Sequence, residues 1–283
     1  MLRRQVYTVT PFRRTLRHRL LRWYADAGRD LPWRRTRDPY AILVSEVMLQ
    51  QTQVSRVVPA YTSFLKRFPT LRSLARAPLG DVLRQWSGLG YNRRARDLHR
   101  VAGLSRSGLP ADAQALDALP GIGAYTAGAV ACFAFGTRTA FADTNIRRVL
   151  GRIVLGRIAT EREAIAIDEE LAPRDARPWH HALMDLGATI CVARAPRCDA
   201  CPLALRCAGR GVDSVATPKR RQSSFASSDR RVRGRIIASL RDGEMTIAGL
   251  RRALDDPRVD RLVATLADEG LVEQRGRWVA LPA

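Results

Sequence analysis

Apolar residues recur at helical spacing along most of the chain. The first such stretch, around Leu16, Leu20 and Trp23, continues directly into Leu31-Pro32-Trp33, so we interpret it as a structural helix. Nothing before residue 228 alternates with a period of two, which predicts an all-α region. The helices expected from this pattern cover 12–28, 40–50, 54–67, 78–86, 91–106, 112–118, 124–134, about 144–155, a stretch after Thr160 with a Thr-x-x-Glu capping box, and 178–190.

The last part of the chain follows a different pattern. Residues 213–228 combine Gly, Ser, Pro and charge with little periodicity, which is typical of a linker. Beyond the linker, the pattern predicts three helices and then two short strands around Arg275-Gly276. That order indicates a winged helix over 229–283, with a generic α+β appendage as the alternative.

The charge of the chain is strongly unbalanced. Its 283 residues include 48 basic and 27 acidic side chains, a net charge of +21, which favours a polyanionic partner such as nucleic acid. Residues 229–283 hold 11 basic and 9 acidic side chains, so we expect this tail to add little to non-specific DNA binding. No apolar run is long enough to span a bilayer, and the cytoplasm is the expected location.

Four of the five cysteines crowd into one short segment, as Cys191-x6-Cys198-x2-Cys201-x5-Cys207. Thiolates at this spacing suit an iron–sulfur cluster or zinc in a reducing compartment, and disulfides are a third possibility. Zinc ribbons usually use two Cys-x2-Cys knuckles, and only one is present, so spacing favours iron–sulfur. The fifth cysteine, Cys132, lies apart in an apolar segment.

Two glycines, Gly121 and Gly123, stand in the segment Leu-Pro-Gly-Ile-Gly between two predicted helices. Glycine permits a positive φ and close approach of another group, and the free amides of the following helix can bind an anion. The segment therefore predicts a helix-hairpin-helix that grips a DNA phosphate without reading sequence. An ordinary helical turn is the alternative.

Two carboxylates stand in opposite environments. Glu46 is the single ionisable residue in Ala41–Leu49, an apolar stretch predicted to be buried, and burial favours the protonated form. Asp143 precedes a helix, where the N-terminal dipole favours the charged form. Such a split suits cleavage of a glycosidic bond through an oxocarbenium-like transition state. The alternatives are an arginine-paired buried Glu46 and a simple helix cap at Asp143.

Five motifs in order resemble the MutY-type adenine DNA glycosylases, and with the cysteine loop the resemblance covers about residues 15–210. The motifs are LPWRRTRDPYAILVSEVMLQQTQV, WSGLGYNRRARDLH, LPGIGAYTAGAV, DTNIRRVLGR and ALMDLGATIC. The resemblance implies the mainly α fold of the helix-hairpin-helix glycosylases. Its six-helix domain would span 29–136, and residues 1–28 and 137–212 would form a helical domain that carries a [4Fe–4S] cluster. The implied substrate is duplex DNA with adenine opposite 8-oxoguanine or guanine.

The resemblance also implies roles for single residues. Glu46 would protonate adenine, and Asp143 would stabilise the sugar cation with help from Tyr125 and Asn145. Residues implied to contact DNA are Arg34 and Asp185, which would hold the flipped adenine, and Gln51 and Tyr91, which would wedge into the duplex.

Lysine, rather than Tyr125, is the residue that endonuclease III-type relatives use for Schiff-base strand cleavage, so we expect no lyase activity. Thr144 departs from the glycine usual in the adenine group, and residues 229–283 are too few for the Nudix-like domain of many members. The alternatives are a thymine or uracil mismatch glycosylase of this superfamily and a non-catalytic DNA-binding regulator. A monomer associated with the bacterial nucleoid is expected.

Overall fold

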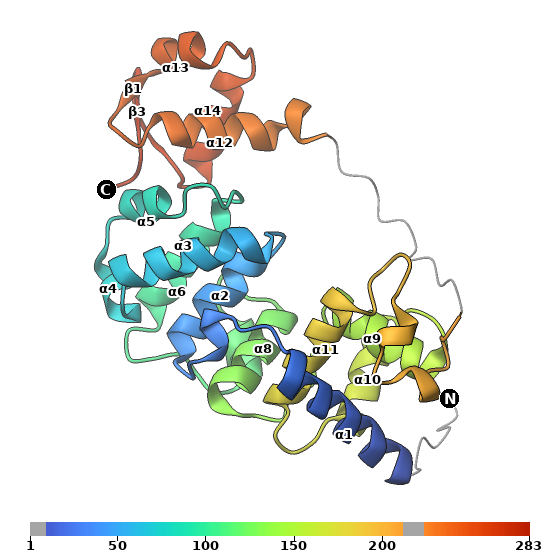
Figure 1. Cartoon of the computed structure of the whole chain (residues 1–283). Helices are drawn as coiled ribbons and strands as arrows, with labels where there is room; N and C mark the ends of the chain where they lie inside the picture. Colours follow the sequence, from blue (N-terminus) through green and yellow to red (C-terminus); the bar gives the residue numbers. More distant parts are fainter. Residues whose placement is uncertain (1–9, 212–223) are drawn as a thin grey trace. The chain divides into compact units, whose positions relative to one another are not determined.

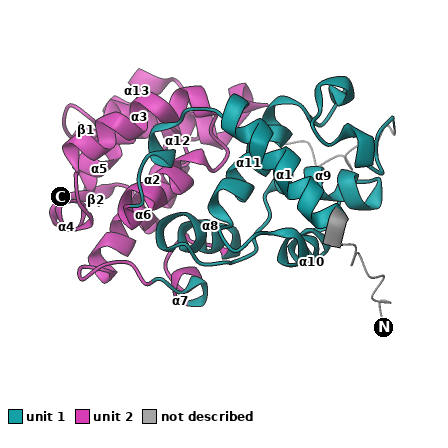
Figure 2. Cartoon of the chain, turned by 60° about the horizontal axis from the view of Figure 1, so that its bottom comes forward, with its two compact units in different colours: residues 1–37, 111–114, 124–219 teal, residues 38–110, 115–123, 220–283 magenta. Residues whose placement is uncertain are grey.

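A computed structural model describes residues 10–211 and 224–283. The chain forms two compact units, which are described here one at a time (Figure 2). Unit 1 comprises residues 1–37, 111–114 and 124–219, and unit 2 comprises residues 38–110, 115–123 and 220–283. Most of the predicted linker, residues 213–223, lies outside the described residues, and its last part contains a short 3₁₀ turn, Phe225–Ser227.

Unit 1 is helical, as the apolar spacing predicted. Its longer helices pack around a core that includes Leu20, Phe141 and Trp179, with α11 in contact with both α1 and α9. Gly187 lets α11 approach the start of α9, because a Cβ at this position would lie 2.6 Å from Cβ of Asn145. The helices are α1 (Thr10–Ala27), α8 (Ala124–Phe135), α9 (Thr144–Leu155), α10 (Glu161–Leu171) and α11 (Arg177–Thr189).

The first part of unit 2 consists of short helices that pack around α2 and α6. They match the predicted spans to within a few residues, except for α4, whose six residues are too few to show a clear period. The short α7 (Ala113–Asp117) crosses from unit 1 into unit 2. The unit 2 helices are α2 (Pro39–Leu49), α3 (Val54–Arg67), α4 (Leu71–Arg76), α5 (Leu79–Gln85) and α6 (Arg93–Leu104).

The C-terminal segment of unit 2 is the predicted winged helix. Its three strands form one antiparallel sheet in the order β1-β3-β2, with Met245 opposite Val279 and Gln274 opposite Val279. The two-residue strand β1 was not predicted, because so short a strand has no visible alternation. The elements follow as α12 (Asp229–Ser239), β1 (Met245–Thr246), α13 (Ile247–Leu254), α14 (Val259–Asp268), β2 (Glu273–Arg275) and β3 (Trp278–Ala280).

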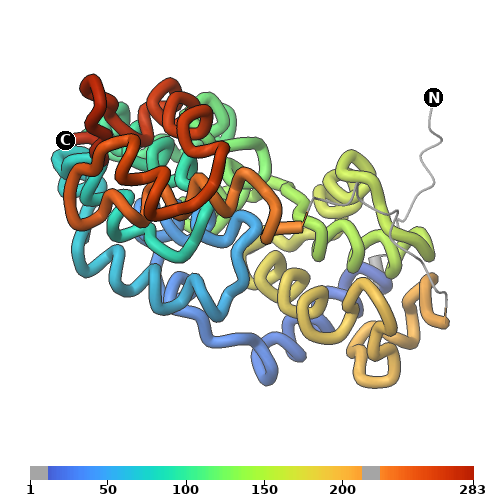
Figure 3. The backbone as a smooth tube through the Cα atoms, turned by 90° about the horizontal axis from the view of Figure 1, so that it is seen from above, coloured from blue at the N-terminus to red at the C-terminus, as the bar shows by residue number. Residues whose placement is uncertain are grey.

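Within unit 2, this segment lies against α5 and α6 (Figures 1 and 3). The amide of Gly80 donates to the carbonyl oxygen of Pro282 at 2.8 Å, and a Cβ at Gly80 would lie 2.6 Å from that oxygen. Arg96 donates to the carbonyl oxygen of Glu269 at 2.5 Å. The winged helix is therefore fixed to its own unit by specific hydrogen bonds. None of the described helices combines the length and hydropathy needed to cross a bilayer.

Candidate active site and cysteine loop

Glu46 lies on α2, a helix that is buried along almost its whole length. Asp38 caps the helix by accepting a hydrogen bond from the Tyr40 amide at 3.0 Å, and Pro39 occupies the first turn. Glu46 retains only 5% of its exposure. The Glu46 side chain is therefore buried on a mostly apolar helix, as the sequence indicated.

Two residues implied to contact DNA have an unusual backbone. Gln51 has a φ of 56° and Tyr91 a φ of 49°, which places both in the left-handed region. Such a conformation costs a non-glycine residue of order 1–3 kcal/mol and persists only where the surroundings enforce it. Gln51 follows α2, Tyr91 precedes α6, and the Tyr91 side chain is 39% exposed.

Arg94 holds the backbone on both sides in this conformation. Its guanidinium donates to the Val47 carbonyl at 2.8 Å, at the C-terminal end of α2, and to the Gly90 carbonyl at 3.2 Å, next to Tyr91. It also lies over the Trp86 and Tyr91 rings, 5.6 and 5.2 Å from their centroids. Burial lowers the pKa of Arg94 to about 10, so the side chain stays charged at neutral pH. Its further acceptors are Met48, Gln50, Thr52 and Leu89.

The predicted hairpin turn is present, and its two glycines differ. Gly121 has a φ of 71°, and a Cβ there would lie 2.8 Å from Cβ of Asp97, so both conformation and space require glycine. Gly123 is outside the left-handed region and has open space where a Cβ would project. Helix α8 starts at Ala124, so the free amides of its first turn follow the turn directly.

Asp143 is the N-cap of α9. One carboxylate oxygen accepts from the Ile146 amide at 2.7 Å, and the other accepts from Nδ2 of Asn145 at 2.8 Å. Both carboxylate oxygens of Asp143 therefore have a hydrogen-bond donor. The structure thus brings Asp143 and Asn145 into direct contact. Tyr125 lies on α8, with its ring 5.6 Å from that of Phe141, two residues before Asp143.

Asp185 is completely buried in an ion pair with two arginines. Arg34 donates from both terminal nitrogens, each at 2.7 Å, and Arg29 donates from its backbone amide at 2.8 Å and from Nε at 2.7 Å. These donors lower the pKa of Asp185 against the effect of its burial. The carboxylate therefore acts on its surroundings through Arg34 and Arg29, and Arg29 was not anticipated from the sequence.

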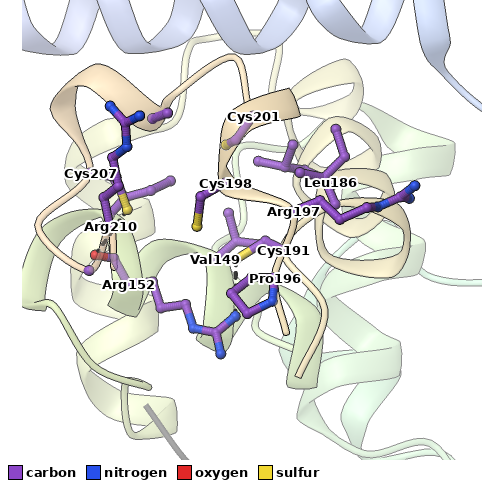
Figure 4. A pocket seen from close by; sticks show the side chains of 14 residues that line it. Val149, Arg152, Leu186, Cys191, Pro196, Arg197, Cys198, Cys201, Cys207 and Arg210 are labelled. Atoms are coloured by element: carbon purple, nitrogen blue, oxygen red, sulfur yellow. Dashed lines mark hydrogen bonds between the residues drawn. The ribbon is translucent and has the colours of Figure 1, made fainter. Parts of the chain in front are cut away.

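The four clustered cysteines line one pocket between α9, α11 and the loop that follows α11 (Figure 4). The rest of the lining is mostly apolar, with Val149, Ile153 and Leu186 among it. All five cysteines are free thiols in the structure. Burial raises the pKa of Cys201 to about 11, so the binding of a metal there must release a proton.

Two arginines of α9 bind the cysteine loop, and one of them, Arg148, also contacts Asn145. Arg148 donates to Oδ1 of Asn145 at 2.7 Å and to the Cys191 carbonyl at 2.6 Å. Arg152 donates to the Val192 carbonyl at 2.7 Å and lies 3.5 Å from Sγ of Cys191. Both are buried, at 8% and 3% exposure. Helix α9 therefore carries Asp143 at its start and anchors the cysteine loop along its side.

The donor set can be compared with the two metals left open by the spacing. Among the described residues, no three His, Cys, Asp or Glu side chains are arranged to hold one metal ion. A tetrahedral zinc requires all four sulfurs within about 2.3 Å of one point. The four thiols around one mostly apolar pocket are the donor set of a thiolate-bound metal centre.

The residues implied by the resemblance fall into two groups. Unit 1 contains Arg34, Tyr125, Asp143, Asn145, Asp185 and the four cysteines, and unit 2 contains Glu46, Gln51, Tyr91, Gly121 and Gly123. The sequence analysis missed Arg94, Arg148 and Arg152. The sequence marks each of them only as an arginine within a predicted helix. That is a weak signal in a chain with so many arginines.

Comparison with known proteins agrees with this architecture. Residues 44–174 match the HhH-GPD superfamily of base excision DNA repair proteins. The adenine DNA glycosylase of Mycolicibacterium smegmatis is 45% identical over 271 residues, which cover 90% of this chain and 92% of that protein. The human adenine DNA glycosylase is 40% identical over 228 residues, 73% of this chain and 41% of the human protein.

Two solved structures share the fold. A thermostable thymine-DNA glycosylase has a TM-score of 0.64 and 29% identity, over 70% of this chain and 96% of that one. A trapped endonuclease III–DNA covalent intermediate has a TM-score of 0.59 and 25% identity, over 70% of this chain and 97% of that one. Such glycosylases are of the kind that carries an iron–sulfur cluster. The chain belongs to the HhH-GPD superfamily and, within it, to the adenine DNA glycosylases.

Proposed function

We propose that this adenine DNA glycosylase acts on duplex DNA in which adenine lies opposite 8-oxoguanine or guanine, and that it leaves the strand intact. The observation that carries the chemistry is the contrast between two carboxyl groups. Glu46 is buried on an apolar helix, and Asp143 is held at a helix N-terminus by two hydrogen-bond donors. In this proposal the buried carboxyl group acts as the acid, and the one at the helix N-terminus stabilises the positive charge that develops on the sugar.

In the proposed reaction, Glu46 gives its proton to adenine N7 as the bond between the base nitrogen and sugar C1′ breaks. The bonding electrons leave with the base, and the sugar becomes an oxocarbenium-like cation that Asp143 stabilises or captures. Glu46, now ionised, accepts a proton from water, whose oxygen adds to C1′. Asn145 keeps Asp143 oriented, and Tyr125 supports the same site from α8.

We also propose that Cys191, Cys198, Cys201 and Cys207 hold a [4Fe–4S] cluster. Four free thiols around one apolar pocket support this assignment, together with the shared fold of endonuclease III. A cluster at this position would fix the loop after α11, which Arg148 and Arg152 join to α9. We further propose that the enzyme works as a monomer on the bacterial nucleoid, in keeping with its bacterial relatives.

The test is a single-turnover assay on duplexes with adenine opposite 8-oxoguanine, adenine opposite guanine, and thymine opposite guanine. Glu46→Gln should lose excision by ~10²–10⁴-fold while it binds DNA nearly as well as wild type. Glu244→Gln makes the same chemical change at an exposed position of the tail and should behave as wild type. A Glu46→Gln rate within tenfold of wild type would exclude Glu46 as the acid.

A second candidate function is removal of mismatched thymine. The structural similarity to a thymine-DNA glycosylase, at 29% identity, favours it over other activities. The duplex with thymine opposite guanine decides between the two. Release of thymine at a rate equal to or above that of adenine would replace the proposed substrate.

A further inference from the structure

A groove of about 920 Å³ lies within unit 2, between the Tyr91 loop and the winged helix. One wall includes Gln51, Arg56 and residues 87–94, and the other is formed by α12 and α14. Its volume is at the upper end of the roughly 300–1,000 Å³ typical of ligand pockets. Both residues implied to enter the duplex, Gln51 and Tyr91, face the winged helix across this groove.

The groove is strongly basic, although the tail as a whole is nearly neutral. Its lining contains seven arginines and two acidic residues. Both acids are already neutralised: Glu269 pairs with Arg93 and Arg233, and Asp229 pairs with Arg261 at 2.8 Å. The hydrogen bond from Arg93 lowers the pKa of Glu269 to about 2, which keeps this pair ionised. The side of the tail that lines the groove is therefore basic, although the net charge of the whole tail is close to zero.

The groove also has features suited to nucleic acid beyond charge. Two exposed aromatic side chains line it, Tyr91 at 39% and Phe225 at 64% exposure. Gly88 and Gly90 have φ values of 82° and 70°, and each has open space where a Cβ would project. Arginines, exposed rings and accessible backbone together are the combination that binds a phosphate backbone and stacks on unpaired bases.

One hydrogen bond crosses the groove at the position of the implied wedge. Arg230 of α12 donates to the hydroxyl of Tyr91 at 3.0 Å. The hydroxyl is a neutral acceptor, and a phosphate oxygen accepts from an arginine about twice as strongly. An incoming backbone phosphate can therefore take Arg230 away from Tyr91, while the contacts of Glu269 with Arg93 and Arg96 keep the winged helix in place.

We propose that the winged helix is the second wall of the DNA-binding groove, where Arg230 and Arg241 contact the phosphate backbone of the duplex that Gln51 and Tyr91 enter. This inference rests on the proposed function for the identity of the DNA. The net charge of the tail predicted that it adds little to DNA binding. The proposal differs because several arginines of the tail lie together in the groove. Arg230 exchanges the Tyr91 hydroxyl for a phosphate as the DNA binds.

The test compares Arg230→Gln/Arg241→Gln with Arg251→Gln/Arg252→Gln in the full-length, cluster-loaded protein. The second pair removes the same charge from α13, outside the groove lining. Affinity for a fluorescein-labelled duplex, with and without adenine opposite 8-oxoguanine, is measured by anisotropy over a salt series. Circular dichroism melting and absorbance of the cluster establish that each variant is folded.

Each phosphate contact contributes about 0.9 to the slope of log affinity against log salt, or roughly eightfold at 0.1 M salt. The groove variant should lose about 1.8 from the slope and on the order of 60-fold in affinity on both duplexes. The α13 variant should lose less than about 0.6 from the slope and less than about fourfold in affinity. Equal losses in the two variants, or none in the groove variant, would overturn the proposal, as would stronger competition by polyglutamate than by unlabelled duplex.

The same series separates this inference from the proposed function. Groove-dependent binding by a protein that releases no adenine at saturating concentration would refute the function and leave the groove intact. Normal adenine release with groove-independent binding would refute the groove and leave the function intact.

Discussion

Replacement of Arg94 is the sharpest test of how this enzyme prepares itself for DNA. The guanidinium donates to carbonyl groups at the end of α2 and in the loop before α6, and so joins the segments that carry Gln51 and Tyr91. Arg94→Met keeps much of the volume and removes every donor. Arg94→Lys keeps the charge but has three donors on one nitrogen, which cannot reach both segments as a planar fork does.

The magnitude follows from these contacts. A hydrogen bond from a charged donor contributes about 1.5–3 kcal/mol, and removing a buried charged partner typically costs about 3–5 kcal/mol in total. Arg94→Met also removes a cation from the C-terminal end of α2, where the dipole favours one. Relaxation of Gln51 and Tyr91 from the left-handed region would return about 1–3 kcal/mol each. The two residues together return about 2–6 kcal/mol against a loss of about 3–6 kcal/mol, so we expect Arg94→Met to lower the free energy of unfolding by no more than about 2 kcal/mol.

The effect on activity should be larger than the effect on stability. Misplacing a positioning group by about 1 Å can cost 10²-fold in rate, so Arg94→Met and Arg94→Lys should both lose about 10²-fold in single-turnover excision at saturating protein. Urea unfolding measures stability, and Arg100→Lys, an exposed position on the same helix, is the matched control. Full excision by a stable Arg94→Lys protein would refute the idea that the fork positions the two segments.

Three further predictions concern the cluster, the reaction and stability. Cys198→Ser should lose iron and acid-labile sulfide, whereas Cys132→Ser, buried apart from the pocket, should keep both; stoichiometric zinc without iron in anaerobic wild type would contradict this. Borohydride should trap no covalent DNA complex, since neither of the chain's two lysines, Lys66 and Lys219, belongs to a motif predicted to be catalytic. Burial lowers the pKa of His181 well below its usual value, so unfolding free energy should fall by up to about 1.4 kcal/mol per pH unit below about pH 6.5, and less steeply in His181→Phe.

The sequence predicted those parts of the fold that depend on a repeating pattern. Helix α3 was predicted with its observed bounds, Val54–Arg67, because its apolar face repeats over several turns and charged residues separate the faces. Helix α4 and strand β1 were missed because each covers fewer than two full periods of its pattern. The cap at Asp143 was predicted because capping depends on a single side chain and its neighbouring amides.

The sequence could not predict how charged groups pair over long separations. Asp185 stands more than a hundred residues from Arg29 and Arg34, yet the three form one buried network. Nothing in a chain with 48 basic residues distinguishes these two arginines from the others. The resemblance supplied Arg34 and Asp185 as a pair, but only the structure shows that Asp185 is fully enclosed and acts through its partners.

The backbone at Gln51 and Tyr91 shows why function was easier to predict than its physical support. A sequence pattern identifies glycine as the residue that adopts a positive φ, and Gly121 follows this rule because Asp97 leaves no room for a Cβ. Gln51 and Tyr91 break the rule, so their side chains must be needed where glycine would be easier to accommodate. The hydrogen bonds of Arg94 to both segments offset the conformational energy of the two left-handed residues. The strained backbone at Gln51 and Tyr91 therefore depends on Arg94. Gln51 lies far from the other two residues in the sequence, so no local pattern links all three.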